Sequence, residues 1–148
     1  MHERILSIDY GRVRHGLAVS DGLGLMAHPL PCLKRTDAAR DEAHLRRLID
    51  ERDVLHLLLG LPLNMDGSEG PMAQEVRRFG ATLSARLKLP LHYEDERLST
   101  DEAETRLQAQ GLRPRERRKL RDSLAAAVIL DGVLGRGGLP PQVEPAPQ

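Results

Sequence analysis

The chain has 148 residues with 22 basic and 22 acidic side chains, so its formal net charge of zero neither demands nor excludes a polyanionic partner. A chain of about 150 residues forms one domain with a substantial core. Its single cysteine, Cys32, excludes an intrachain disulfide and a cysteine-based metal site, and no apolar run reaches the roughly 20 residues of a membrane span. We therefore expect a cytoplasmic protein with no membrane partner.

The first stretch of the chain predicts a β-hairpin with an acid at its tip. An apolar strand over Arg4–Asp9 ends in a carboxylate, and a turn rich in Arg and Gly leads into a second apolar strand over Arg14–Ser20. Gly11 lacks a side chain, so a cation or a phosphate can approach the backbone beside Asp9. An acidic site would form here if acidic residues from later in the chain lie close to Asp9 in the folded protein.

Strands and helices alternate after this hairpin, with periodicities that predict each element. In chain order they are a third strand within 25–33 that two prolines restrict to an edge, a helix over 40–51, a buried parallel strand over 54–60, a loop over 61–70, a helix from Pro71 to about residue 87, a strand over 90–96, a helix over 99–110, a basic connector over 113–121 and a last helix over 122–134.

The order of the elements predicts the fold class. Three strands in succession, followed by alternating helices and strands, indicate an α/β protein with a mixed five-stranded sheet flanked by helices. This order resembles the ribonuclease H-like arrangement, in which the first strand is central. We expect one domain over residues 1–136. The tail over 137–148 is rich in Gly and Pro and has too few apolar residues to fold alone, so we expect it to be disordered.

Three acids stand where packing does not require a carboxylate. Asp9 ends the first strand, Glu96 follows Asp95 at the end of the last strand, and Asp122 opens the last helix on the same face as Ile129. The ends of parallel strands meet at one edge of a sheet, so these acids can converge. Clustered carboxylates repel one another unless a divalent cation neutralises them, and oxygen ligands favour Mg²⁺ or Mn²⁺.

Such a site suits phosphodiester hydrolysis, in which two ions about 4 Å apart activate a water and stabilise the leaving oxygen. Each acid also has a plain structural interpretation. Asp9 is a common turn residue, Asp122 is a common helix N-cap, and Glu96 can form a surface ion pair with Arg97. Strand alternation sends Asp95 and Glu96 to opposite faces, so only one of them can face Asp9, and spacing leaves open which.

Nucleic-acid contacts are expected from Arg, backbone amides and metal, because one Phe, two Tyr and no Trp make a base-stacking surface improbable. The loop over 61–70 ends at a helix N-terminus that can bind an anion, although a plain connection explains it equally well. The Arg-Gly turn and the basic connector are equally explained as solvated charge. The residues we predict to contact nucleic acid are Arg12, Arg14, Asn64, Arg97, Arg117, Arg118 and Lys119.

Four blocks of sequence, ILSIDYGRVRHGLAVSD, LLLGLPLNMDGSEGP, EDERLST and RDSLAAAVIL, closely resemble the YqgF (RuvX) family of bacterial proteins. Members of this family are described as Holliday junction resolvases and as nucleases that process the ends of the precursor of 16S ribosomal RNA. The resemblance implies a ribonuclease H-like, metal-dependent nuclease whose catalytic and metal-binding acids are Asp9, Glu96 and Asp122. It therefore favours Glu96 over Asp95.

The resemblance leaves the substrate open between precursor ribosomal RNA and branched DNA, because both present phosphates to a metal site. Resolution of a symmetric junction needs two active sites, and that activity would imply a homodimer. The alternative hypothesis is a ribosome-assembly factor that binds RNA with little cleavage of its own. A nucleotide-binding protein of the actin and sugar-kinase type is disfavoured, because those proteins pair two domains around the nucleotide.

Overall fold

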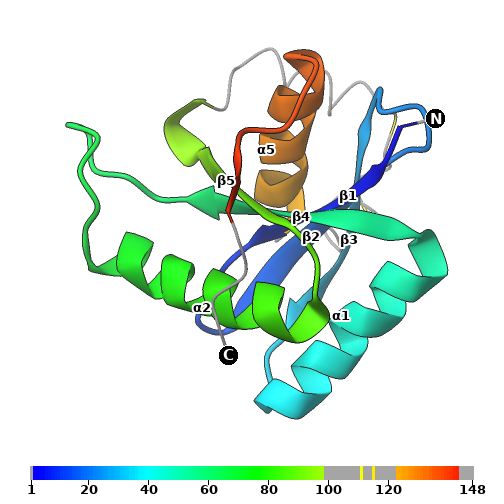
Figure 1. The fold of residues 1–148 in the computed structure, drawn as a ribbon, viewed down its shortest axis with the longest axis horizontal. Helices are drawn as coiled ribbons and strands as arrows, with labels where there is room; N and C mark the ends of the chain where they lie inside the picture. The colour runs from blue at the N-terminus through cyan, green and yellow to red at the C-terminus, as the bar shows by residue number, and fades with distance from the viewer. Residues whose placement is uncertain (1, 99–110, 112–114, 116–122, 144–148) are drawn as a thin grey trace.

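The computed structural model describes residues 2–98, 111, 115 and 123–143. The elements within these residues are β1 Arg4–Asp9, β2 Arg14–Ser20, β3 Ala27–Lys34, α1 Ala38–Arg52, β4 Val54–Leu61, α2 Pro71–Leu87, β5 Leu91–Asp95, the 3₁₀ helix η1 Glu96–Leu98, α5 Leu124–Gly135 and β6 Gln142–Val143. The strands form one mixed sheet in the order β3-β2-β1-β4-β5-β6. Helices α1 and α2 cover one face of this sheet and α5 covers the other (Figure 1).

Strand β1 lies in the middle of the sheet, as the sequence predicts. It pairs antiparallel with β2, where Asp9 lies opposite Gly16, and parallel with β4, where Ile8 lies opposite Leu59. Strand β5 pairs parallel with the other side of β4. The carboxyl ends of β1, β4 and β5 therefore meet at one edge of the sheet.

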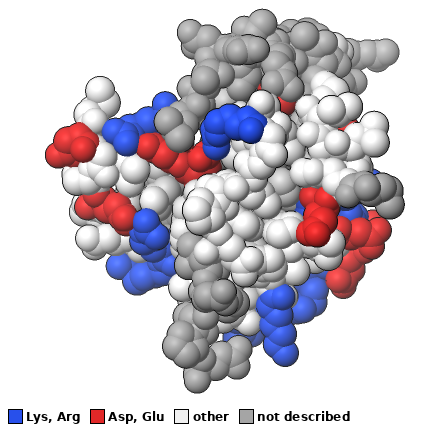
Figure 2. Space-filling view, turned by 45° about the horizontal axis from the view of Figure 1, so that its top comes forward, with Lys and Arg blue, Asp and Glu red and all other residues white. Residues whose placement is uncertain are grey.

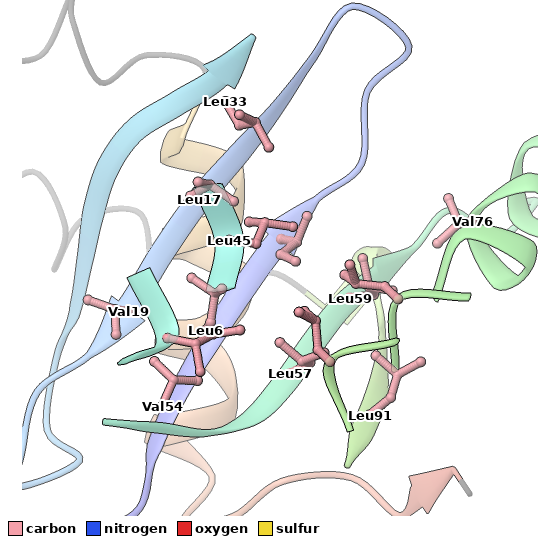
Figure 3. Close-up of a cluster of buried hydrophobic side chains, with 14 of the residues drawn as sticks. Leu6, Leu17, Val19, Leu33, Leu45, Val54, Leu57, Leu59, Val76 and Leu91 are labelled. Carbon is pink, nitrogen blue, oxygen red and sulfur yellow. The ribbon is translucent and has the colours of Figure 1, made fainter. Parts of the chain in front are cut away.

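The two faces of the sheet bury side chains of different sizes. Alternation along β1 points Leu6 and Ile8 toward α1 and α2, and points Ile5 and Ser7 toward α5. The face under α1 and α2 is built from large aliphatic side chains, most of them leucines (Figure 3). The face under α5 contains many small side chains, which let the helix backbone approach the sheet closely; its alanines are Ala18, Ala27, Ala126 and Ala127.

Most of the predicted elements are confirmed, with ends displaced by a few residues. Helix α1 begins before the predicted residue 40, because the Asp37 side chain accepts a hydrogen bond from the Arg40 backbone N–H at 2.8 Å. Pro71 is the first residue of α2, and the proline-containing β3 lies at a free edge of the sheet. The described part of α5 has Ser123 as its N-cap, and the interpretation of Asp122 as an N-cap concerns a residue outside the described ones.

The disorder predicted for residues 137–148 is wrong for the part of this tail that the structure describes, which ends at residue 143. Gln142 lies opposite His92 and gives the sheet a short sixth strand beyond the five predicted. His92 Nδ1 donates to the Pro140 carbonyl at 2.7 Å, and Leu139 packs against the α5 cluster. The segment is ordered by pairing with a sheet edge, which its composition does not reveal.

The helix predicted over residues 99–110, most of the basic connector over 113–121 and Asp122 lie outside the described residues. They stay predictions of the sequence. Among the helices that the structure does describe, none combines the length and the apolar content that crossing a membrane requires.

Candidate active site

Two of the three predicted acids meet at the carboxyl edge of the sheet, on the face covered by α5. Asp9 ends β1, Glu96 directly follows β5, and the two carboxyl groups lie close enough for the charge of Asp9 to raise the pKa of Glu96. The sequence prediction that Asp9 and Glu96 converge is therefore confirmed as geometry.

Burial makes this pair costly to ionise. It raises the pKa of Asp9, and the hydrogen bond with Glu96 offsets part of that rise. Burial, followed by the negative charge of Asp9, raises the pKa of Glu96 to about 7. Near neutral pH Glu96 is therefore protonated in part of the molecules, and a bound cation would displace that proton.

Gly60 of β4 makes the meeting of the two acids possible. Strand β4 lies between β1 and β5, and a Cβ atom at residue 60 would come within 2.8 Å of Glu96 Oε1 and 2.6 Å of Ile129 Cδ1. The absence of a side chain therefore leaves the space in which Glu96 reaches across β4 toward Asp9. Sequence reasoning missed this role, although an isolated glycine within an aliphatic strand is a signal of close approach.

Asp95 lies on the opposite face from Glu96, and its partner is Arg97. The Arg97 guanidinium donates to Asp95 Oδ2 from Nη2 at 2.7 Å and to Oδ1 from Nε at 3.1 Å. This contact holds the pKa of Asp95 below its usual range. The surface ion pair considered for Glu96 is therefore wrong, because Arg97 pairs with Asp95 instead.

Buried serines attach α5 to the strands that carry the site. Ser7 lies two residues before Asp9 on the same face of β1, and its hydroxyl donates to the Ala126 carbonyl at 2.9 Å. The Leu17 backbone N–H donates to Ser123 Oγ at 3.0 Å, at a β-bulge where the β2–β3 register shifts. Sequence reasoning missed both serines; for Ser7, a serine on the buried face of a strand was the available signal.

The hairpin after Asp9 is held in place by its own backbone and by two side chains. A Cβ atom at Gly11 would lie 2.0 Å from the Arg14 carbonyl oxygen, so the turn excludes any side chain there. The Gly11 N–H donates to His15 Nδ1 at 3.2 Å, and Arg35 Nη1 donates to the Gly11 carbonyl at 3.1 Å. The backbone beside Asp9 is thus positioned from the other face of the sheet.

The basic residues predicted on this hairpin lie at its exposed surface. Arg12 forms a salt bridge with Glu75 of α2, with 3.2 Å between Nη2 and Oε1. Tyr10 donates to the same carboxylate at 2.6 Å, which links the hairpin to α2. Arg14 is the exposed first residue of β2. Contact of Arg12 and Arg14 with nucleic acid stays a prediction.

The loop between β4 and α2 is closed by its own polar groups. Asn64 donates from Nδ2 to Ser68 Oγ at 3.0 Å, and the Ser68 backbone N–H donates to Asp66 Oδ1 at 2.9 Å. Arg97 Nη1 donates to the Met65 carbonyl at 3.0 Å, which fixes the loop against η1. Asn64 and Arg97 stay predicted nucleic-acid contacts, while Arg117, Arg118 and Lys119 lie outside the described residues.

Charged side chains on the surface are intermixed rather than segregated. On the face drawn in Figure 2, acidic side chains lie next to basic ones toward the edges, and the middle of the face is uncharged. The described basic residues near the site therefore act beside acidic neighbours, as Arg12 does with Glu75 and Arg97 with Asp95.

The residues at the site fit a hard divalent cation. Asp9 and Glu96 present carboxylate oxygens from two strands at one place, and the preferred ligands of Mg²⁺ are oxygens. Over residues 2–98, 111, 115 and 123–143, the side chains do not assemble three acidic, histidine or cysteine ligands at one point. The third predicted ligand, Asp122, lies outside these ranges.

A family model described as "RuvX: Holliday junction resolvase" matches residues 3–136. The chain belongs to the RuvX family. A relative from Anaeromyxobacter dehalogenans, named "Putative pre-16S rRNA nuclease", is 47% identical over 133 residues, which cover 90% of this chain and 97% of the relative. A relative of the same name from Cereibacter sphaeroides is 46% identical over 132 residues, covering 89% and 82%.

The RuvX chain also resembles a solved structure described as T. thermophilus RuvC in complex with Holliday junction substrate. The TM-score is 0.58 at 17% sequence identity, and the match covers 93% of this chain and 98% of the RuvC chain. At this identity the likeness concerns the fold alone. It confirms the predicted ribonuclease H-like fold.

Proposed function

We propose that this RuvX protein is a divalent-metal-dependent endonuclease that hydrolyses phosphodiester bonds in nucleic acid. The observation that carries the proposal is the meeting of Asp9 and Glu96 over Gly60 at the carboxyl edge of the sheet. Isolated structural carboxyl groups do not need to be gathered in a half-buried place where ionisation is costly. We assign Asp122, which directly precedes the buried Ser123 in the sequence, as the third ligand.

Asp9 and Glu96 act as oxygen ligands for Mg²⁺ or Mn²⁺. When bound, such ions supply Lewis acidity that activates a water and stabilises the leaving oxygen of an in-line displacement. Glu96 must release its proton before it can act as a ligand, so low pH opposes metal binding. Gly60 and the serine contacts of α5 hold the ligands in position before substrate arrives.

The first candidate substrate is the end of precursor 16S ribosomal RNA, because the relatives from two organisms carry that name. The second candidate is a four-way DNA junction, which the family description favours. A symmetric junction is cut at two positions related by a two-fold axis, so junction resolution predicts a homodimer with two copies of the acid pair. Processing of one RNA end requires only a monomer.

The experiment is a cleavage assay of purified protein with Mg²⁺ or Mn²⁺ and an EDTA control. A precursor 16S ribosomal RNA fragment and a four-way DNA junction are offered side by side. Asp9→Asn tests the site, and Asp50→Asn removes an exposed acid of α1 as a matched control. Metal-dependent cutting that Asp9→Asn loses and Asp50→Asn keeps supports the proposal.

The same assay identifies the substrate by which of the two molecules is cut. Cutting that persists in EDTA, or that Asp9→Asn retains at the wild-type rate, contradicts the proposed site. Binding of RNA without cleavage of either substrate contradicts the nuclease and supports the assembly-factor hypothesis.

A further inference from the structure

A cavity of about 410 Å³ lies between α1 and α2, on the face of the sheet opposite α5. Figure 1 shows both helices on this side of the sheet. The volume falls in the range of small-molecule pockets, roughly 300 to 1,000 Å³. The cavity is separated by the sheet from the face that carries Asp9 and Glu96, so the proposed nuclease site does not account for it.

One wall of this cavity is aromatic. The rings of Phe79 on α2 and His15 on β2 pack with their centroids 4.8 Å apart, and Tyr10 packs against both at 5.0 and 5.2 Å. Phe79 and His15 line the cavity together with the aliphatic side chains of Leu45 and Leu83. A flat ring can stack on such a wall, and the aliphatic side chains exclude water from its other surfaces.

His15 gives the cavity a buried hydrogen-bond donor. The residue is 1% exposed, and its Nδ1 accepts the Gly11 N–H, so the ring proton resides on Nε2. Burial lowers the pKa of His15 to about 4, which keeps the ring neutral. The ring lines the cavity, and Nδ1 is the nitrogen that faces Gly11, so the Nε2–H is available to a ligand in the cavity. Such a donor favours a ligand that brings an acceptor.

The charged side chains around the cavity already have partners. Arg86 forms a salt bridge with Glu42, and Asp41 accepts from the backbone N–H and hydroxyl of Thr36 at 3.1 Å each. Arg35 donates to backbone carbonyls of the first hairpin. Two arginines and two acids leave the rim without net charge. The cavity therefore favours a neutral ligand over an ion.

We propose that this cavity binds a neutral, flat heteroaromatic ring that carries a hydrogen-bond acceptor, the chemistry of a nucleobase. The ring stacks on Phe79, and its acceptor receives the Nε2–H of His15. Leu45 and Leu83 bury the remaining apolar surface. The ligand can be a free nucleoside or the terminal base of a strand, and the two sources share this chemistry.

The test measures quenching of the fluorescent purine 2-aminopurine, because stacking on an aromatic side chain quenches it and the chain has no Trp to interfere. The full chain is titrated with free 2-aminopurine riboside and, separately, with a short single-stranded RNA that ends in 2-aminopurine. All titrations contain EDTA, so the result does not depend on the proposed nuclease activity. We expect saturable quenching with a Kd of about 1 mM or tighter.

Two variants of exposed α2 residues form the matched comparison. Thr82 lines the cavity, and Thr82→Phe fills it. Gln74 is an exposed residue of the same helix that does not line the cavity, and Gln74→Phe adds the same ring elsewhere. We expect Thr82→Phe to weaken binding at least tenfold and Gln74→Phe to leave it unchanged. His15→Phe keeps the ring and removes the donor, and should weaken binding about tenfold.

Quenching of the free riboside that Thr82→Phe abolishes supports the site and identifies a free heterocycle as its ligand. Quenching of the RNA probe alone, with the same sensitivity to Thr82→Phe, supports the site and identifies a strand end. The proposal is overturned if neither probe gives saturable quenching, or if Thr82→Phe binds both probes as the wild type does.

Discussion

The two faces of the sheet beside the first hairpin both bury titratable groups, with opposite consequences. On the α5 face, burial raises the pKa of Glu96 to about 7, so the carboxylate that chemistry needs is disfavoured at neutral pH. On the α1/α2 face, burial lowers the pKa of His15 to about 4, so the ring is already in its favoured neutral form. In both cases desolvation favours the neutral form of the side chain. For Glu96 the neutral form is the one that cannot bind a metal, whereas for His15 it is the form that the fold contains.

Neighbouring residues of β4 express the same contrast in packing. Leu59 is fully buried among the large aliphatic side chains under α1 and α2. Gly60 points to the other face, where a side chain would collide with Glu96 and Ile129. Leu59 contributes buried apolar area to the core, whereas Gly60 has no side chain and so leaves space for the carboxyl group of Glu96. Stability is concentrated on one face of this strand and the proposed chemistry on the other.

The largest effect is expected from Asp9→Asn, which removes a proposed metal ligand and keeps the size of the side chain. Cleavage should fall by at least about 100-fold, because changes even one shell further from a metal cost 10-fold to 100-fold. Thermal unfolding measured without metal should show a folded protein. A variant that unfolds at the wild-type temperature and cuts at the wild-type rate would remove Asp9 from the site.

Leu59→Ala should lower the free energy of unfolding by about 3 kcal/mol, because it leaves a cavity in the aliphatic cluster. The acid pair lies on the other face, so cleavage per folded molecule should stay within about twofold of wild type. Urea denaturation and a cleavage assay at low temperature measure the two quantities. A large loss of activity in the folded variant would show that the two faces are coupled.

Acid should destabilise the protein through His15. Its pKa is lower in the folded chain than in the unfolded chain, so the unfolded chain binds more protons between pH 6.5 and about 4. Stability therefore falls as pH decreases through this window, by about 2 to 3 kcal/mol. His15→Phe should lack this part of the pH dependence. Parallel stability curves for the two proteins between pH 6.5 and 4 would contradict the prediction.

Gly60→Ala should lower the free energy of unfolding by about 1 to 3 kcal/mol, the usual range for overpacking a buried site. It should also lower cleavage about tenfold, because Glu96 is displaced from Asp9. Activity and unfolding are compared with those of Leu59→Ala. If Gly60→Ala loses stability but keeps full activity per folded molecule, the position of Glu96 is less critical than its contacts indicate.

Glu96→Gln should give the smallest change in stability and the opposite sign. The pKa of Glu96 is higher in the folded chain, so the wild type loses stability as pH rises from 4.5 to about 7. Without metal, the variant should be more stable than wild type at pH 7.5 by about 1 to 2 kcal/mol, after allowance for solvent screening. Equal unfolding temperatures at pH 4 and a gap at pH 7.5 are expected. If the variant is less stable than wild type at pH 7.5, ionisation of Glu96 does not destabilise the folded protein and the prediction is wrong.

Several features of this protein follow from local sequence patterns. The edge position of the strand with two prolines and the start of α2 at Pro71 were predictable, because each depends on neighbouring residues. The central position of the first strand was expected from the resemblance of the element order to the ribonuclease H-like arrangement. Asp9 was recognisable as an acid at the end of a strand. The four sequence blocks that resemble the RuvX family led to the same fold and to the choice of Glu96, and the family assignment is confirmed.

Tertiary structure decided the rest, because it depends on register and on contacts between distant segments. Strand alternation alone did not tell whether Asp95 or Glu96 faces Asp9. The pairing of β4 with β5 decides it, because this register places the Glu96 side chain over Gly60. The same register leaves Asp95 on the other face, where it forms a salt bridge with Arg97. The tail forms the short strand β6 because it pairs with β5 at the edge of the sheet, although its composition is typical of a disordered segment. A residue's type determines which interactions it can make, whereas its three-dimensional neighbours determine which one it makes.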